Sequence, residues 1–276
     1  MNLFTTLFYS LVMGLTEILP VSSQAHQMLF SALRGSTSEP ALLRFLIHIG
    51  IATALYFNCQ NHILRMTRAQ RLSRIAKHKR TRPLDTNSLM DLRLLQTMLI
   101  PVVIGFVNFQ RLQGIVSILS TLSGILLING LILYLPQFLP GSNKTSLSIS
   151  PFDGILLGIA AVASLIPGIS CVGIVISVAL IRGVEKTYAL NMALLLNIGM
   201  MLGWIAFDLI NIINVGAGVN SFGGVVSAIL GAAAACGGAF LGIWVMKKLA
   251  ASRGFGIFAY YSWGAAMFLF ILFLSV

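Results

Sequence analysis

The chain has 276 residues, of which 57% are hydrophobic and only 9% carry a charged side chain, and it contains three cysteines. Soluble domains are about 25% charged, so this composition excludes an ordinary soluble protein. Three cysteines are too few for a secreted disulfide scaffold, and the apolar content excludes a disordered chain. We therefore predict a membrane protein that crosses the bilayer several times.

The net charge of +11 is concentrated in one polar segment, because nine of the 18 lysines and arginines lie between His62 and Arg93. A basic segment between apolar ones is typical of a cytoplasmic loop attracted to anionic lipid head groups. Arg65, Arg68, Arg71 and Arg74 are three residues apart, which places them along one stripe of an interfacial helix. Nucleic-acid binding is the alternative, but the segment has no aromatic side chain on which a base could stack. We expect membrane lipids and no nucleic acid as partners.

Six stretches are long and apolar enough to span a membrane as helices, which requires about 20 residues each. They are residues 41–60, 94–110, 113–135, 187–212, 222–246 and 255–275. Two more apolar stretches, 3–33 and 151–182, are interrupted near their middle by Pro, Gly and polar residues. We interpret them as re-entrant, broken helices, so the predicted fold is an all-α membrane protein with about six spanning helices and two re-entrant segments. Gly231, Gly238 and Gly242 predict a close helix–helix contact.

The two interrupted stretches are similar to each other. A shift of 147 positions aligns Pro20 with Pro167 and Ser23 with Ser170, and a polar link at 137–150 lies between the two stretches. We therefore predict one membrane domain, 1–276, built from two repeats of about 1–136 and 151–276. Broken helices at corresponding places in two halves indicate a buried binding site, because irregular backbone at membrane depth needs protein or a water-filled cavity around it.

Glu17 is the most informative residue, because a carboxylate inside an apolar span is costly and usually functional. Ser22, Ser23 and His26 follow it across the break at Pro20. Histidine can act as a general acid or base, serine as a nucleophile or phosphate ligand, and Glu17 as a base, orienting group or metal ligand. Backbone N–H groups freed at the break suit an anion such as phosphate. The alternative is a kinked packing helix whose polar side chains satisfy one another.

Gly14 to Ser23, together with His26, closely resemble the first signature of the undecaprenyl-pyrophosphate phosphatase family, the bacitracin-resistance type. The likeness continues in order along most of the chain. Leu46–Gly50, Ile100–Pro101 with Gly105, Pro167–Ser170 with Gly173, and Phe258–Tyr261 resemble later family segments.

The resemblance implies six spanning helices and two re-entrant pairs in inverted repeats, with a site that cleaves the terminal phosphate from undecaprenyl pyrophosphate. It implies Glu17 as the essential acid, with Ser23 and His26 serving attack and proton transfer, and it leaves open which of those two is the nucleophile. It also implies magnesium or calcium as a cofactor, with Glu17 as its ligand. The expected substrate-binding residues are Thr16, Ser22, Gly168, Ser170 and Gly173. The resemblance further implies a bacterial inner-membrane location with the 62–93 loop cytoplasmic, and a homodimer is one expectation for the oligomeric state.

The chain departs from the family pattern at several positions, of which the most important is Cys171, where the second signature usually has arginine. Val172 replaces the following serine, and Met13, Ala161 and Ser262 replace polar or charged family residues. A guanidinium is the natural clamp for a diphosphate in a low-dielectric pocket. No obvious replacement is found in the sequence, since Arg182 lies eleven residues further on and is expected at the membrane interface.

These departures leave alternatives to hydrolysis. One is a non-hydrolytic relative that binds or translocates a polyprenyl phosphate, and a less favoured one is a secondary transporter of a small anion. Cys171 is expected to be a structural thiol, because its neighbours are apolar. His48 and Cys171 are candidates to line the cavity, and Asp208 is a second carboxylate inside a predicted span.

Overall fold

The computed structural model describes residues 2–35, 39–80, 82–109, 119–139, 143–219, 221–251 and 254–275. Within these ranges every regular element is a helix, which confirms the predicted all-α class. Six of the helices are long and apolar enough to cross a membrane. They are α3 (Ala41–Ser73), α4 (Thr86–Val107), α6 (Leu119–Tyr134), which runs on into the 3₁₀ turn η3 (Leu135–Phe138), α9 (Lys186–Val215), α10 (Phe222–Ala251) and α11 (Ile257–Ser275). The predicted spans match these helices, although residue 110 and residues 113–118 lie outside the described ranges.

The two interrupted stretches form pairs of short helices. The first pair is α1 (Leu3–Ile18) and α2 (Ser23–Arg34), and the second is α7 (Pro151–Ala163) and α8 (Cys171–Ile181). Each of these helices is shorter than the roughly 20 residues that a membrane crossing needs. The breaks therefore lie where the sequence predicted them.

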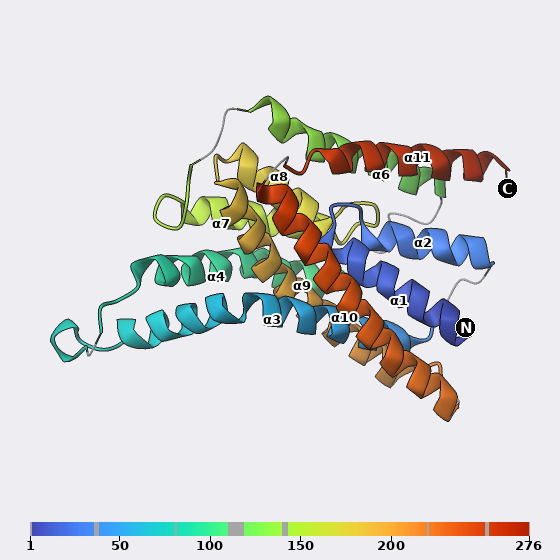
Figure 1. Ribbon diagram of the computed structural model, residues 1–276, viewed down its shortest axis with the longest axis horizontal. Coiled ribbons are helices and arrows are strands. Elements are labelled where there is room, and N and C mark those ends of the chain that lie inside the picture. The colour runs from blue at the N-terminus through green and yellow to red at the C-terminus, as the bar shows by residue number, and fades with distance from the viewer. Residues whose placement is uncertain are drawn as a thin grey trace.

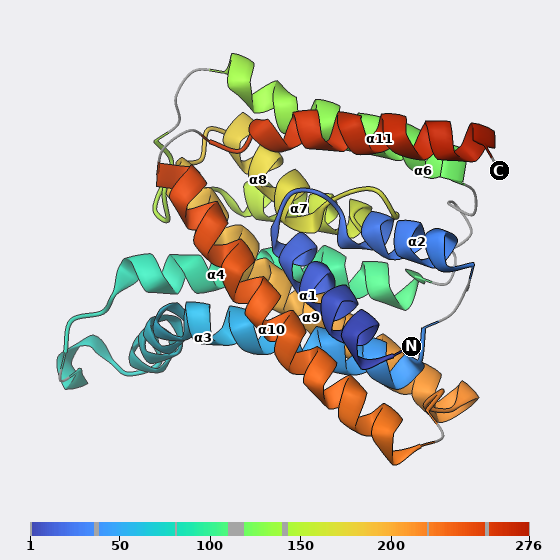
Figure 2. The ribbon, with the colours of Figure 1, turned by 45° about the vertical axis from the view of Figure 1, so that its right-hand side comes forward.

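Helices of the first half of the chain pack against helices of the second half, an arrangement here called the exchange of helices. Helix α1 packs against α10 of the second half, and α7 packs against α4 of the first half, while α3 packs against α9 and α6 against α11. Figures 1 and 2 show α6 and α11 side by side along one edge and α1 lying across α10. Two structurally related halves would produce such an exchange, and the division into repeats stays a prediction. The exchange brings the two helix breaks into the middle of the protein.

Small residues allow the close approach of α1 and α10. A Cβ atom on Gly238 would overlap the carbonyl oxygen of Leu11, and one on Gly14 would overlap that of Ala235. A Cβ on Gly242 would lie 2.9 Å from that of Ile18. The predicted contact of Gly231, Gly238 and Gly242 is thus a contact within the chain.

We expect Gly238→Leu to destabilise the protein by about 1–3 kcal/mol or more, because the backbone of α1 has no room to accept a side chain. Gly237→Leu is the matched control, since nothing lies within 4 Å of a Cβ at the neighbouring position. Thermal unfolding in detergent, followed by circular dichroism, compares the two variants. Equal midpoints would show that the contact is not tight.

The basic segment begins as a continuation of α3. Arg65, Arg68, Arg71 and Arg74 are all exposed, while Met66 and Ala69 on the other face are buried, so the predicted arginine stripe on a helix is confirmed. This end of α3 and the start of α4 together project beyond the other helices, as Figures 1 and 2 show. The segment continues through the short turn η1 (Lys77–Lys79), and Asp85 then caps α4. The Ser88 hydroxyl donates to Asp85 at 2.6 Å, which lowers the pKa of that carboxyl group.

Candidate active site

Helix α1 ends because of the sequence Leu19-Pro20. The residue before a proline is restricted to extended conformations, and Leu19 accordingly has φ −75° and ψ 149°. Ser22 then adopts φ 59°, in the left-handed region that side chains rarely occupy. Its hydroxyl accepts a hydrogen bond from the Ala25 N–H at 3.4 Å and so caps α2. The strained turn reverses the chain and places Ser23 at the first position of α2.

The second break also combines a helix end with a residue of positive φ. Ser164, Leu165 and Ile166 end α7 in tight turns, and Gly168 adopts φ +103°. A side chain at Gly168 would be strained, and its Cβ would lie 2.7 Å from the Ile125 side chain, so glycine is required there. Ser170 caps α8 by accepting from the Gly173 N–H at 3.2 Å.

The two breaks contact each other directly. The Gly168 N–H donates to the Ser22 hydroxyl at 3.1 Å, and the Ser170 hydroxyl donates to the Leu19 carbonyl at 3.3 Å. A Cβ on Gly173 would lie only 3.0 Å from that of Pro20. Serines from each half therefore bridge to the backbone of the other half. The structure thus brings together four of the predicted substrate-binding residues, namely Ser22, Gly168, Ser170 and Gly173.

Glu17 and Ser23 meet beside these breaks. The Ser23 hydroxyl donates a hydrogen bond to Glu17 Oε2 across the turn. Both residues line a small hollow of about 20 Å³, here called the inner hollow, together with Thr16, Ser22, Ser170 and Cys171. The N-termini of α2 and α8 both open on it, because Ser23 and Cys171 are their first residues. Thr16 turns its hydroxyl back to the Val12 carbonyl at 2.8 Å.

A larger cavity of about 200 Å³, here called the main cavity, adjoins the inner hollow, since Glu17, Ser23, Gln24 and Trp204 line both. Its other polar side chains are Tyr9, Gln27, Arg44 and His48, and its aromatic wall also includes Phe109 and Phe207. A space of this size holds several water molecules or a small polar head group. Glu17 and Ser23 therefore face a cavity with room for a ligand.

Asp208 joins two residues of the main cavity. Arg44 Nε donates to Asp208 Oδ1 at 2.6 Å, and His48 Nδ1 lies 2.7 Å from Asp208 Oδ2. Arg44 and His48 are four residues apart on α3 and so share one face of that helix. Asp208 comes from α9 and is fully buried. The carboxylate suspected from the sequence is thus an anchor for side chains of the cavity.

His26 faces a different space. It lines an apolar pocket of about 340 Å³ with Tyr261 and with Leu126, Phe268 and Leu269 among other side chains. Its Nδ1 lies 2.8 Å from the Ser22 carbonyl oxygen and its Nε2 lies 2.6 Å from the Tyr261 hydroxyl. The structure therefore does not place His26 in the cavity of Glu17 and Ser23, and its predicted role in attack or proton transfer stays a prediction.

Comparison with known proteins bears on this site. Residues 6–268 match the family of the bacitracin resistance protein BacA. The undecaprenyl-diphosphatase of Carboxydothermus hydrogenoformans is 30% identical over 263 residues, which cover 95% of this chain and 94% of that protein. The chain belongs to the BacA family.

Other BacA-family relatives are similarly distant. Undecaprenyl-diphosphatase 3 of Frankia alni is 33% identical over 223 residues, covering 76% of this chain and 73% of that protein. The undecaprenyl-diphosphatase of Methanobrevibacter smithii is 27% identical over 278 residues, covering 98% of both chains. The likeness thus extends over the whole membrane domain and includes both breaks.

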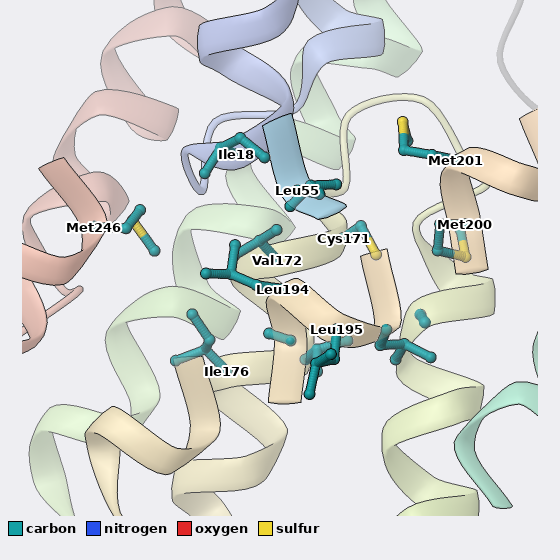
Figure 3. Close-up of a cluster of buried hydrophobic side chains, with 14 of the residues drawn as sticks. Ile18, Leu55, Cys171, Val172, Ile176, Leu194, Leu195, Met200, Met201 and Met246 are labelled. Carbon is teal, nitrogen blue, oxygen red and sulfur yellow. The ribbon is translucent and has the colours of Figure 1, made fainter. Parts of the chain in front are cut away.

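Cys171 is the position at which, by the resemblance described above, the second signature usually has arginine. The thiol lines the inner hollow, while Val172 beside it packs among Ile176, Leu194 and other core side chains in Figure 3. Arg182 lines neither the main cavity nor the inner hollow, because its Nε donates to Asp153 Oδ1 at 2.6 Å near the start of α7. Arg182 therefore lies outside these two cavities, as the sequence predicted.

The sequence interpretation missed two residues of this region. Arg44 was passed over, although it is an ionisable residue inside the predicted span 41–60, which is the signal that singled out Glu17. Asn197 of α9 is fully buried, and its side chain interacts with the Glu17 carboxylate of α1. Asn197 is therefore a polar neighbour of Glu17 that comes from the second half of the chain.

The residues of this site fit a metal ion only if the substrate provides some of its ligands. Among the described residues, no group of three or more His, Cys, Asp and Glu side chains is arranged to hold an ion by itself. Glu17 is the carboxylate that lines both the main cavity and the inner hollow. Magnesium commonly binds one or two carboxylates together with phosphate oxygens and water. A site formed by Glu17 and a diphosphate is consistent with this donor set.

Proposed function

We propose that this chain is an undecaprenyl-diphosphate phosphatase, which removes the terminal phosphate of the polyprenyl carrier used for cell-wall polymers and so recycles it. The observation that carries the proposal is the meeting of the two helix breaks around the Glu17–Ser23 pair, at a cavity large enough for a head group. Family membership and relatives that are named undecaprenyl-diphosphatase support it.

Ser23 is the proposed nucleophile, because its hydroxyl already donates to Glu17 whereas His26 faces another pocket. Its Oγ attacks the terminal phosphorus while its proton passes to Glu17. The bond from that phosphorus to the bridging oxygen breaks, and undecaprenyl phosphate leaves. Glu17 passes this proton to the departing undecaprenyl phosphate and is again ionised. Water then attacks the phosphoserine while Glu17 accepts its proton, the bond from phosphorus to Ser23 Oγ breaks, and Glu17 returns the proton to Ser23 as phosphate leaves.

The remaining predicted residues hold the head group in this proposal. Serines at the breaks keep the N-termini of α2 and α8 aimed at the inner hollow, and the positive ends of two helices favour an anion there. Gly168 and Gly173 permit the close packing that keeps both ends in place, and Thr16 lines the inner hollow with its hydroxyl bonded to the Val12 carbonyl. When bound at Glu17, magnesium or calcium would offset the charge of the diphosphate.

We further propose the bacterial inner membrane as the location, with the basic 62–93 segment on the cytoplasmic side, because its exposed arginines satisfy the positive-inside rule. A homodimer is a further proposal, which crosslinking in native membranes would test.

The test of the main proposal is phosphate release by the purified protein in detergent. With undecaprenyl or farnesyl diphosphate and magnesium, we expect inorganic phosphate to appear well above a protein-free control, and a metal chelator to reduce the rate. Folded protein that binds undecaprenyl phosphate but releases no phosphate would support the non-hydrolytic alternative instead. That alternative is not favoured, because the relatives are named as phosphatases.

A further inference from the structure

Arg44 places a positive charge at the main cavity, and it does not belong to the second signature. It lies on the first turn of α3, lines the main cavity with Glu17 and Ser23, and its side chain is 30% exposed. No lysine and no other arginine among the described residues lines the main cavity or the inner hollow. This guanidinium therefore faces the space in which a diphosphate would be hydrolysed.

Asp208 holds Arg44 in a way that leaves donors free. A guanidinium has five N–H donors in a rigid fork, and the hydrogen bonds among the described residues use only Nε–H, which donates to Asp208. Because Asp208 is 0% exposed and also contacts His48, its position is fixed by packing on α9. The four N–H groups of the two η nitrogens make no hydrogen bond among the described residues, although the Glu39 carboxylate is close enough to attract the guanidinium. These four groups are the donors that an anion in the main cavity can use.

The aromatic wall supports the same arrangement. His48 stacks on Trp204 with ring centroids 5.8 Å apart, and Trp204 packs against Phe109 and Phe207. These contacts hold His48 against Asp208, and they give one side of the main cavity an apolar wall. Charge-assisted hydrogen bonds are stronger where water is excluded.

We propose that Arg44, oriented by Asp208, binds the phosphate oxygens of the substrate and takes the role of the arginine that Cys171 replaces. This inference rests on the proposed phosphatase function. In it Arg44 is a substrate-binding residue that stabilises charge developing on the transferred phosphoryl group, and Asp208 is a positioning residue that acts through Arg44. The cation thus comes from α3 of the first half rather than from α8 of the second.

The test compares Arg44→Gln with Arg182→Gln. Arg182 is a matched control, because its Nε also donates to an aspartate at 2.6 Å but it lines neither the main cavity nor the inner hollow. With farnesyl diphosphate as the probe, we expect Arg44→Gln to lower kcat/KM by about 10²–10³-fold, the typical effect of losing one such donor. Arg44→Lys should recover part of the rate, and Arg182→Gln should stay within about threefold of the parent.

Arg44→Gln removes the arginine partner of the buried Asp208 and leaves its contact with His48. The double variant Arg44→Gln with Asp208→Asn, in which both charges are removed, is therefore measured as well. If Asp208 acts through Arg44, this double variant loses no more kcat/KM than Arg44→Gln, and Asp208→Asn alone shows a weaker affinity for methylene diphosphonate, measured as its inhibition constant. Parent-like kcat/KM in the folded double variant would overturn the inference. Absence of phosphate release by the parent protein would instead overturn the proposed function itself.

Discussion

Glu17→Gln is expected to reduce phosphate release by about 10²–10⁴-fold, the range in which general acid–base catalysis contributes. The amide keeps the size of the side chain and a carbonyl oxygen that can accept the Ser23 hydrogen bond, but it cannot take the Ser23 proton. It also removes the carboxylate proposed to hold the metal. Initial rates of phosphate release from farnesyl diphosphate at saturating magnesium measure the effect.

Three further variants are needed to interpret that result. Ser23→Ala should cause a loss of similar size, and the double variant should be no slower than either single one, because the two residues act as a unit. Glu185→Gln is the control, since Glu185 caps α9 through the Thr187 and Tyr188 N–H groups and lines neither the main cavity nor the inner hollow. Activity of Ser23→Ala near that of the parent would leave water as the direct nucleophile and would reject the phosphoserine.

The elements of the fold could be predicted from the sequence because their signals are local. Length and hydropathy placed the six spanning helices, and Pro20 and Pro167 marked both breaks. The exchange of α1 and α7 between the halves could not be predicted in the same way. It depends on which glycine-lined surfaces meet, and a glycine pattern identifies a close contact without naming the partner helix.

The candidate site was predictable where one short segment builds it. Glu17 and Ser23 are six residues apart across one turn, so their hydrogen bond follows from the turn itself. His26 is also near in sequence, but one helical turn beyond Ser23 it faces α11 rather than the main cavity. Arg44 enters the cavity only because α3 packs against α9, which brings Asp208 to it. Contacts between distant segments are not visible in local spacing.

The structure also shows which reversion to the family pattern is informative. Replacing Val172 by Ser would bury a hydroxyl at a side chain that is 0% exposed and packed in the core. A buried hydroxyl without a partner costs about 1–3 kcal/mol, so the variant would mix a stability effect with a catalytic one. Cys171 differs, because it lines the inner hollow next to Glu17 and Ser23. Cys171→Arg alone is therefore the better test.

We expect the effect of Cys171→Arg on kcat/KM to depend on whether Arg44 is present. Where Arg44 is present, a second guanidinium adds little, and kcat/KM should change by less than about tenfold. In the Arg44→Gln, Asp208→Asn double variant the same substitution should restore at least about tenfold of the lost rate, because no other arginine among the described residues would then line the main cavity or the inner hollow. Phosphate release from farnesyl diphosphate measures both, after thermal unfolding has confirmed that each variant is folded.

Cys171→Met is the control for this experiment, because it adds side-chain volume at the inner hollow without charge. One outcome is that Cys171→Arg restores kcat/KM in the double variant alone, while Cys171→Met restores it in neither background. In that case Arg44 and position 171 serve one electrostatic role from different halves of the protein. An equal gain in both backgrounds would mean that the two positions act independently and that Arg44 does not replace the lost arginine. Since α3 and α8 reach the site from separate halves, such a replacement would allow the second signature to lose its arginine while phosphate binding persists.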